Sequence, residues 1–212
     1  PKDDEPAPLS FTLAEGTHKE GLGGRRKSLK VDDGWLVGFD GGEWGGALWW
    51  FSPDGRKRLK LGDDLVGVLV GTPSGPLAFE NLQRGSRVVR LAHDHSGGWT
   101  RQVIGRLRHW TFAAVGDRDG SLIVLTDERL QRFAPETGKT EILVDDGVWA
   151  GLYPNSMVVA PSGVVFAGMR HGVARIEKKE KEDEYRVTWL LPDKRIADRD
   201  NEPDRKDRPA FK

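Results

Sequence analysis

The apolar residues of this chain occur in short runs of about five, separated by glycine, proline and charged residues. Three such runs follow one another at 157–160, 164–167 and 173–176. β-Branched residues fill the runs, and a Pro-Ser-Gly sequence separates the first two. Runs of this length between turn residues predict short β-strands that pair with their chain neighbours in an antiparallel sheet.

The same pattern occurs four times along the chain. The turn between the first two strands carries Gly34, Gly75, Gly120 and Gly163, which are 41, 45 and 43 residues apart. The later strands of the copies are predicted at 35–39, 76–79, 122–125 and 164–167, then 47–51, 87–91, 130–134 and 173–177, then 57–61, 100–104, 140–144 and 185–190. A four-stranded unit repeated at this period is typical of a propeller blade. We therefore predict an all-β fold, a small β-propeller of four or five four-stranded antiparallel blades.

The domain boundaries follow from the repeats and from the composition of the two ends. The repeats cover about 28–64, 65–107, 108–147 and 148–192, within a propeller domain at 9–192. Residues 1–8 are acidic and proline-rich, which predicts a disordered arm or tether. Residues 9–13 can form an extra strand that closes the propeller. Residues 193–212 are predicted to be a charged tail.

Charge and composition narrow the range of partners. The 33 basic and 33 acidic side chains balance to zero, which argues against a nucleic-acid partner because such binding needs clustered positive charge. The chain has no cysteine, which excludes disulfides, thiol catalysis and cysteine-ligated metals. No apolar run reaches the roughly 18 to 20 residues of a transmembrane segment. The acidic arm fits a cleaved leader or a lipid anchor upstream of Pro1, so we expect a periplasmic or secreted protein.

Blade connectivity predicts which loops lie at the same end of the molecule. In an antiparallel blade, the loop before strand one and the loop between strands two and three share an end, which we call the loop end. Tryptophan, tyrosine and arginine are enriched at binding hot spots, so we predict that this end binds a protein partner. Trp110 and Trp149 could instead pack between blades. The predicted binding residues are Glu43, Trp44, Arg84, His109, Trp110, Trp149, Tyr153, Arg170 and His171.

One blade carries a family resemblance. The sequence Pro-Asn-Ser-Met-Val-Val-Ala-Pro-Ser-Gly at 154–163 resembles the blade signature of the calcium-dependent gluconolactonase and strictosidine-synthase-like propellers. The resemblance implies that Asn155 ligates a calcium ion that polarises a lactone carbonyl. By loop position Glu43 and Asn81 could join it, since calcium accepts such oxygen ligands. Ser156 and Ser162 depart from the signature, and four repeats are found where that group has six.

Two functions therefore remain open from the sequence. The first is a non-catalytic binding module without a cofactor, of inhibitor, immunity or receptor type, that engages a protein partner. The alternative is a calcium-dependent lactonase-like hydrolase.

Overall fold

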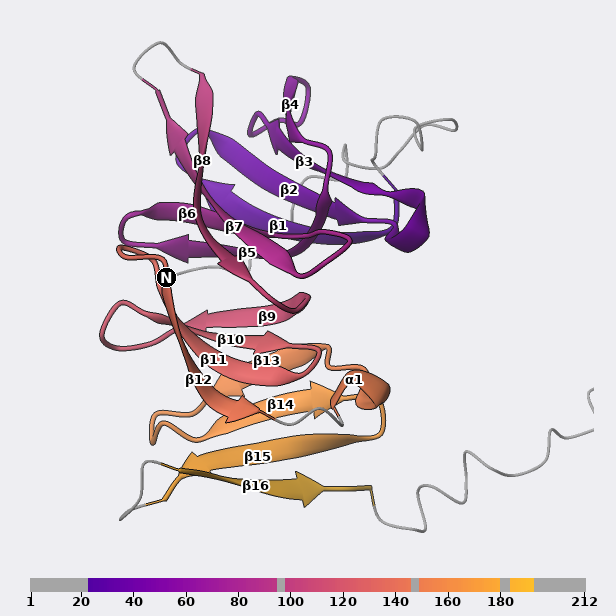
Figure 1. Cartoon of the computed structure of the whole chain (residues 1–212). Coiled ribbons are helices and arrows are strands. Elements are labelled where there is room, and N and C mark those ends of the chain that lie inside the picture. The colour runs from indigo at the N-terminus through magenta and orange to yellow at the C-terminus, as the bar shows by residue number, and fades with distance from the viewer. Residues whose placement is uncertain (1–22, 95–97, 146–148, 180–183, 193–212) are drawn as a thin grey trace, which may run out of the picture.

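The computed structural model describes residues 23–94, 98–145, 149–179 and 184–192. Within these ranges sixteen strands form four antiparallel sheets of four consecutive strands (Figure 1). The predicted all-β fold of four-stranded antiparallel blades is confirmed, with four blades in the described part of the chain. The predicted disordered arm at 1–8, the extra strand at 9–13 and the charged tail at 193–212 lie outside the described residues.

Each blade takes its strands in chain order. Blade 1 contains β1 (Arg25–Val31), β2 (Gly34–Asp40), β3 (Gly46–Phe51) and β4 (Arg58–Gly62). Blade 2 contains β5 (Leu65–Thr72), β6 (Gly75–Asn81), β7 (Ser86–His93) and β8 (Trp99–Leu107). Blade 3 contains β9 (Thr111–Gly116), β10 (Leu122–Thr126), β11 (Arg129–Ala134) and β12 (Lys139–Asp145). Blade 4 contains β13 (Ser156–Val159), β14 (Val165–Met169), β15 (Gly172–Lys178) and β16 (Tyr185–Leu190).

The repeat register is correct at the turns. Gly34, Gly75, Gly120 and Gly163 all have positive φ, as four equivalent turns require. At Gly163 the φ of 86° lies in the left-handed region, which a β-carbon penalises. Glycine therefore recurs at this turn in all four repeats because the backbone conformation of the turn requires it, and not because of a contact with another blade.

Blade 1 begins earlier than the sequence indicated. β1 starts at Arg25 and pairs with β2 over its whole length, from Arg25 opposite Asp40 to Val31 opposite Gly34. The sequence predicts the repeat start near residue 28, because 21–27 is rich in glycine and basic residues. The basic side chains are compatible with a strand because β1 is at the edge of its sheet, where lysine and arginine are common.

Successive blades pack face to face through apolar side chains. β5 lies against β1, β2 and β3 on one side and against β9 on the other, and β13 lies against β9. Leu36 and Val66 belong to the core between blades 1 and 2, and Phe79 meets Phe133 edge-on at 6.1 Å between blades 2 and 3. Figure 1 shows the blades stacked in chain order, with blades 1 and 4 at opposite ends.

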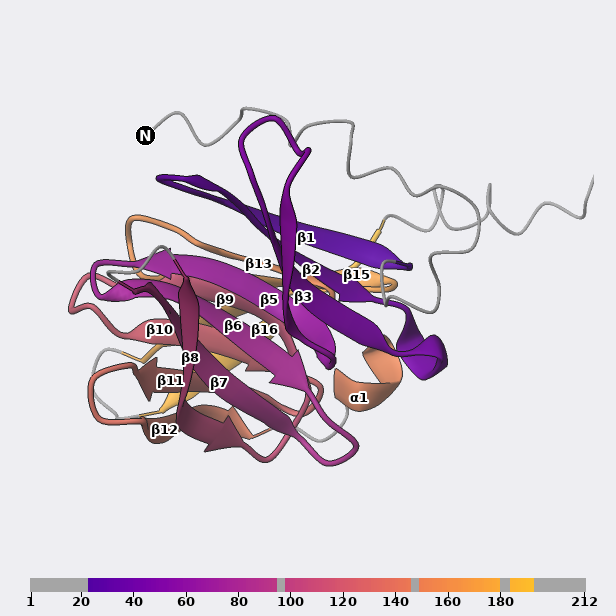
Figure 2. The same cartoon turned by 90° about the horizontal axis from the view of Figure 1, so that it is seen from above.

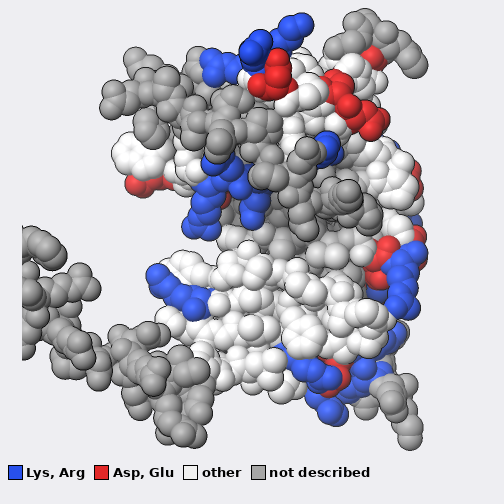
Figure 3. Space-filling view, turned by 180° about the vertical axis from the view of Figure 1, so that it is seen from behind, with Lys and Arg blue, Asp and Glu red and all other residues white. Residues whose placement is uncertain are grey.

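The first strands of blades 2 to 4 carry no charged residue. Viewed from above in Figure 2, blade 3 runs from β9 to β12 across the stack, with β12 at the side away from β1 and β13. Seen from behind, the lower half of the molecule shows a broad area without lysine, arginine, aspartate or glutamate (Figure 3). This surface agrees with the uncharged sequences of β9 and β13.

None of the described helices is long and apolar enough to span a bilayer.

Candidate functional site

The loop end presents several of the predicted binding residues. A short 3-10 turn at Gly42–Trp44 and the helix α1 (Trp149–Leu152) lie on the same side of the molecule in Figure 1. Trp44, Tyr153 and Trp110 have 80%, 60% and 36% of their surface exposed. Glu43, Arg84, Arg170 and His171 are also exposed. This end therefore carries exposed aromatic and basic side chains from all four blades or their connecting loops.

Tyr153 is held in a defined position in front of blade 4. Its φ of 53° makes it the non-glycine residue with a positive φ in the described part of the chain. The Arg170 guanidinium stacks over the Tyr153 ring at 4.7 Å from the ring centre. The backbone N–H of Arg170 also donates to the backbone carbonyl of Leu152 in α1 at 2.8 Å. This bond joins the loop before β13 to the turn after β14. Non-glycine residues in the left-handed backbone region cluster at active sites and ligand clamps.

Trp44 extends from a loop that its own hydrogen bonds close. The Gly41 N–H donates to Gly45 O at 2.8 Å, and the Trp44 N–H donates to Gly41 O at 3.2 Å. The Gly42 N–H donates to the Asp40 carboxylate at 3.0 Å. The loop is thus a hydrogen-bonded turn, and its glycines serve the turn while the indole stays in solvent.

Two predicted binding residues have structural positions instead. Trp149 is fully buried in the core between blades 3 and 4, so its prediction as a binding residue is wrong. Its place at the start of α1 directs the indole into that core. Trp110 is half-buried, and its indole N–H donates to Leu82 O of blade 2 at 2.6 Å. Trp110 therefore joins two blades while one side of its ring remains accessible.

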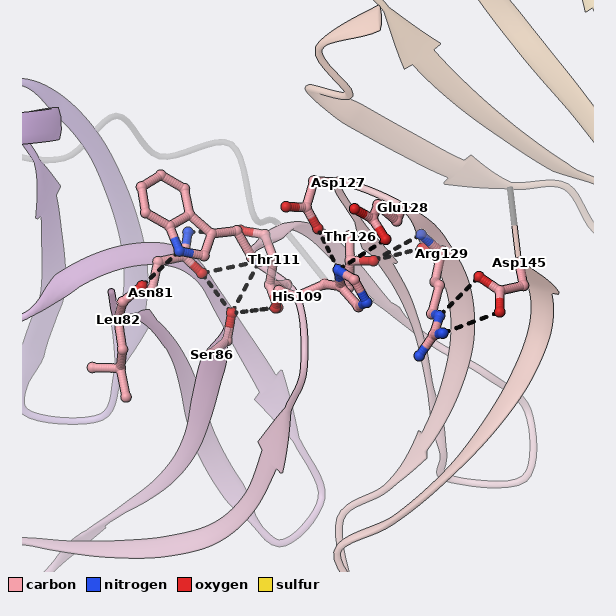
Figure 4. Close-up of polar contacts among 11 residues, drawn as sticks. Asn81, Leu82, Ser86, His109, Thr111, Thr126, Asp127, Glu128, Arg129 and Asp145 are labelled. Carbon is pink, nitrogen blue, oxygen red and sulfur yellow. Dashed lines mark hydrogen bonds and ion pairs between the residues drawn. The ribbon is translucent and has the colours of Figure 1, made fainter. Parts of the chain in front are cut away.

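His109 lies against two carboxylates in a polar cluster that the sequence did not reveal. Its Nδ1 lies 3.3 Å from an Asp127 oxygen and 3.5 Å from a Glu128 oxygen (Figure 4). Burial raises the pKa of Asp127, an effect that His109 opposes and Glu128 reinforces. The other ring nitrogen, Nε2, is buried without a hydrogen-bond partner among the described residues. The His109 side chain is 13% exposed, so the imidazole is largely enclosed by the protein.

Asn81 joins blade 2 to blade 3. Its Nδ2 donates to Thr111 O at 3.1 Å, and its Oδ1 accepts the Thr111 N–H at 2.9 Å (Figure 4). Ser86 Oγ lies 2.7 Å from the same Oδ1 and 2.9 Å from His109 O. The glycine at position 67 fits here because a β-carbon would come within 2.7 Å of Asn81 Nδ2. The donor and the acceptor of the Asn81 amide are thus both bonded to Thr111.

The residues considered for calcium do not fit an ion. Asn81 is buried with its amide fully bonded, and the Asn155 oxygen accepts the Ser156 hydroxyl at 2.8 Å. Asn155, Asn81 and Glu43 belong to three different blades, and no hydrogen bond joins them in the described structure. Within the same residues there is no group of three or more histidine, aspartate or glutamate side chains arranged for a metal. At Asn81, a calcium ion would have to displace the hydrogen bonds that join blade 2 to blade 3.

A cleft lies on the side of the molecule opposite the loop end, between the turns of blades 1 and 2. It has a volume of 710 Å³ and is lined by Asp33, Thr72, His93 and Trp99, among others. His93 Nε2 lies 2.9 Å from Asp33, and the His93 ring meets Trp99 edge-on at 5.1 Å. The sequence does not indicate this cleft, because its lining comes from two blades. The cluster of His109 with Asp127 and Glu128 could have been predicted from the sequence, because the strand connectivity places all three residues at the loop end of blade 3.

Comparison with protein-family models and with curated proteins gives no match. Among solved structures, a periplasmic gluconolactonase from Pseudomonas aeruginosa is similar with a TM-score of 0.54 and 14% identity, over 83% of this chain and 56% of that one. A protein from Lactobacillus plantarum has a TM-score of 0.53 and 13% identity, over 77% and 54%. The extracellular domain of a putative one-component system from B. thetaiotaomicron has a TM-score of 0.55 and 13% identity, over 79% and 22%.

These likenesses concern the fold alone, because the identities are low. The chain spans about half the length of the Pseudomonas and Lactobacillus structures. With four sheets of four antiparallel strands packed face to face in chain order, the described chain has the architecture of a β-propeller.

Proposed function

We propose that this chain is a non-catalytic propeller module that binds another protein through its loop end. The observation that carries the proposal is Tyr153, whose ring is exposed and fixed by a left-handed backbone and by the Arg170 stack. A preorganised aromatic side chain binds at a low entropic cost, and a neighbouring arginine adds directed hydrogen bonds. Trp44 offers a second anchor at the same end.

The polar clusters of the loop end support binding over catalysis. His109 has its second nitrogen buried, and Asn81 is occupied by the joint between blades. Glu80 is fully buried between Arg87 at 2.6 Å and Arg101 at 2.5 Å, which makes it part of the frame of blade 2. Apart from Glu43, the exposed binding residues of the loop end are then aromatic or basic, which suits carboxylates and carbonyls on a protein surface.

An extracytoplasmic location is part of the proposal. Two of the similar structures are described as a periplasmic enzyme and as an extracellular domain. An inhibitor, an immunity protein and a receptor domain would each use a face of this kind, and the chemistry of the face does not separate the three.

Selection of binders from a phage-displayed random peptide library on the immobilised protein tests the proposal. Truncating Tyr153 or Trp44 to alanine should weaken the selected peptides at least about 30-fold, which corresponds to the usual hot-spot threshold of about 2 kcal/mol. Melting temperature should change little, since both rings are largely in solvent.

Val103→Ala and Ile142→Ala are matched controls. Both side chains are about half exposed, and both lie on the outer strands β8 and β12, away from the loop end. These variants should bind the selected peptides as the wild type does. Peptides that depend on the controls and not on Tyr153 or Trp44 would show that another surface is the binding face.

A further inference from the structure

Two backbone hydrogen bonds tie the segment around Tyr153 to the end of β14. The Arg170 N–H donates to Leu152 O at 2.8 Å. The Asn155 N–H donates to Gly168 O at 3.0 Å. These bonds lie on either side of Tyr153, whose carbonyl also accepts the side-chain N–H of Asn155 at 3.4 Å. The Tyr153 ring and the Arg170 side chain are therefore held by the same short stretch of paired backbone.

This pair differs from the other cation–π contacts of the described chain in the exposure of its ring. Each of the other contacts places a lysine or an arginine over a tryptophan that is 8% exposed, either Trp35 or Trp49. Tyr153 has 60% of its surface exposed, and the Arg170 guanidinium lies 4.7 Å from the centre of its ring. A bound molecule can therefore reach the ring and the guanidinium together.

The Arg170 guanidinium has donors that the described part of the chain does not use. A cation above an aromatic ring is attracted by the ring electrons and needs no hydrogen bond. Among the described residues, none accepts a hydrogen bond from this guanidinium, and none forms an ion pair with it. A guanidinium has five N–H donors in a planar fork. The pair thus presents a positive charge and unpaired donors beside an apolar ring.

We propose that Arg170 binds a carboxylate of the partner protein, while Tyr153 packs against the residue beside that carboxylate. The inference rests on the proposed function, because it names the group that the loop end recognises. A guanidinium binds a carboxylate through two parallel N–H···O bonds. Arg129 and Asp145 show this arrangement within the chain, with bonds of 2.9 and 3.0 Å. The single charge of Arg170 matches a carboxylate monoanion better than a phosphate dianion.

The fixed position of the pair makes such a contact effective at an exposed site. An exposed ion pair usually contributes little, because two long side chains must both be ordered when it forms. The contact with Tyr153 already restricts Arg170, so less side-chain entropy is lost on binding. A partner residue that covers the ring also keeps water from the ion pair, and the lower local dielectric strengthens it.

The carboxylate can come from an aspartate or glutamate side chain or from the C-terminus of the partner. The probes are peptides selected on the immobilised protein and synthesised with a free C-terminus. In each peptide the side-chain acids are replaced one at a time by amides, and the C-terminus is amidated separately. One of these changes should weaken binding to the wild type at least about tenfold, because it removes a charge-assisted bond. With Arg170→Gln, the same change should weaken binding less than about twofold, because the carboxylate has lost its partner.

Two further variants separate the planar fork from charge alone. Arg170→Lys keeps the charge but loses the paired donors, so it should bind the peptides at least about threefold more weakly than the wild type. Arg186→Gln is the matched control, since Arg186 is an exposed arginine of the same blade that lies opposite Glu177 in the strand register. It should bind the peptides as the wild type does. Melting temperatures of all these variants should stay close to that of the wild type, because the substituted side chains are exposed.

The outcome separates this inference from the proposed function. Peptides that lose affinity with Tyr153→Ala, but respond equally to amide replacement in the wild type and in Arg170→Gln, would overturn the carboxylate contact and leave the proposed function intact. Peptides that depend on neither Tyr153 nor Trp44 would overturn both.

Discussion

Replacing Asn81 with aspartate tests how blades 2 and 3 are joined. The change keeps the size and one acceptor oxygen but converts the Nδ2 donor into a second acceptor. That atom donates to Thr111 O at 3.1 Å in a site that is 5% exposed. Two oxygens would then face each other where water has little access.

The expected cost follows from the bonds at the joint. An unpaired buried polar group costs about 1 to 3 kcal/mol, and burying a carboxylate adds to that, so Asn81→Asp should lower the free energy of unfolding by about 3 kcal/mol. Asn81→Ala should cost about 2 kcal/mol, because the Thr111 N–H keeps Ser86 Oγ at 3.0 Å as an acceptor. Burial should raise the pKa of the new aspartate, so its destabilisation should lessen as the pH falls and the acid becomes a donor to Thr111 O.

Urea unfolding followed by circular dichroism measures these differences. Asn155→Ala is the control, since this asparagine lies in an exposed loop and should stay within about 0.5 kcal/mol of the wild type. The reasoning would be refuted if Asn81→Asp were as stable as the wild type and calcium raised its melting temperature. That result would mean that Asn81 does not join blades 2 and 3 and would favour a metal ligand at this position.

Three other predictions concern turns, acid and calcium. Gly163→Val should cost about 1 to 3 kcal/mol because of its φ of 86°, whereas Gly116→Val, at an open position without positive φ, should cost less; urea unfolding decides. Hydrogen bonds from Arg129 lower the pKa of Asp145, so this pair stabilises the fold above the unfolded pKa and is lost as the pH falls through the lower folded pKa. Arg129→Gln should therefore lower the melting temperature near pH 7, with the gap to the wild type closing toward about pH 2. Melting temperatures in chelator and in millimolar calcium should agree, because the Asn81 amide is occupied; a rise with calcium would support the lactonase-like alternative.

The sequence by itself determined the strands, the turns and the phase of the repeats. These features depend on residues close in the chain, since each hairpin pairs neighbours through a short connection. The left-handed turn at Gly163 and the pairing of β14 with β15 could both be predicted for this reason. The loop end was also predictable, because alternating strand direction fixes which loops share an end.

Only the tertiary structure decided which side chains of these elements are covered. Trp44 and Trp149 both lie in connections between strands at the loop end, yet one is in solvent and the other is in the core between blades 3 and 4. Asn81 meets Thr111 across a separation of 30 residues. Burial and polar pairing at such positions depend on the neighbouring blade that packs there, and a local pattern holds no information about the distance and angle between blades.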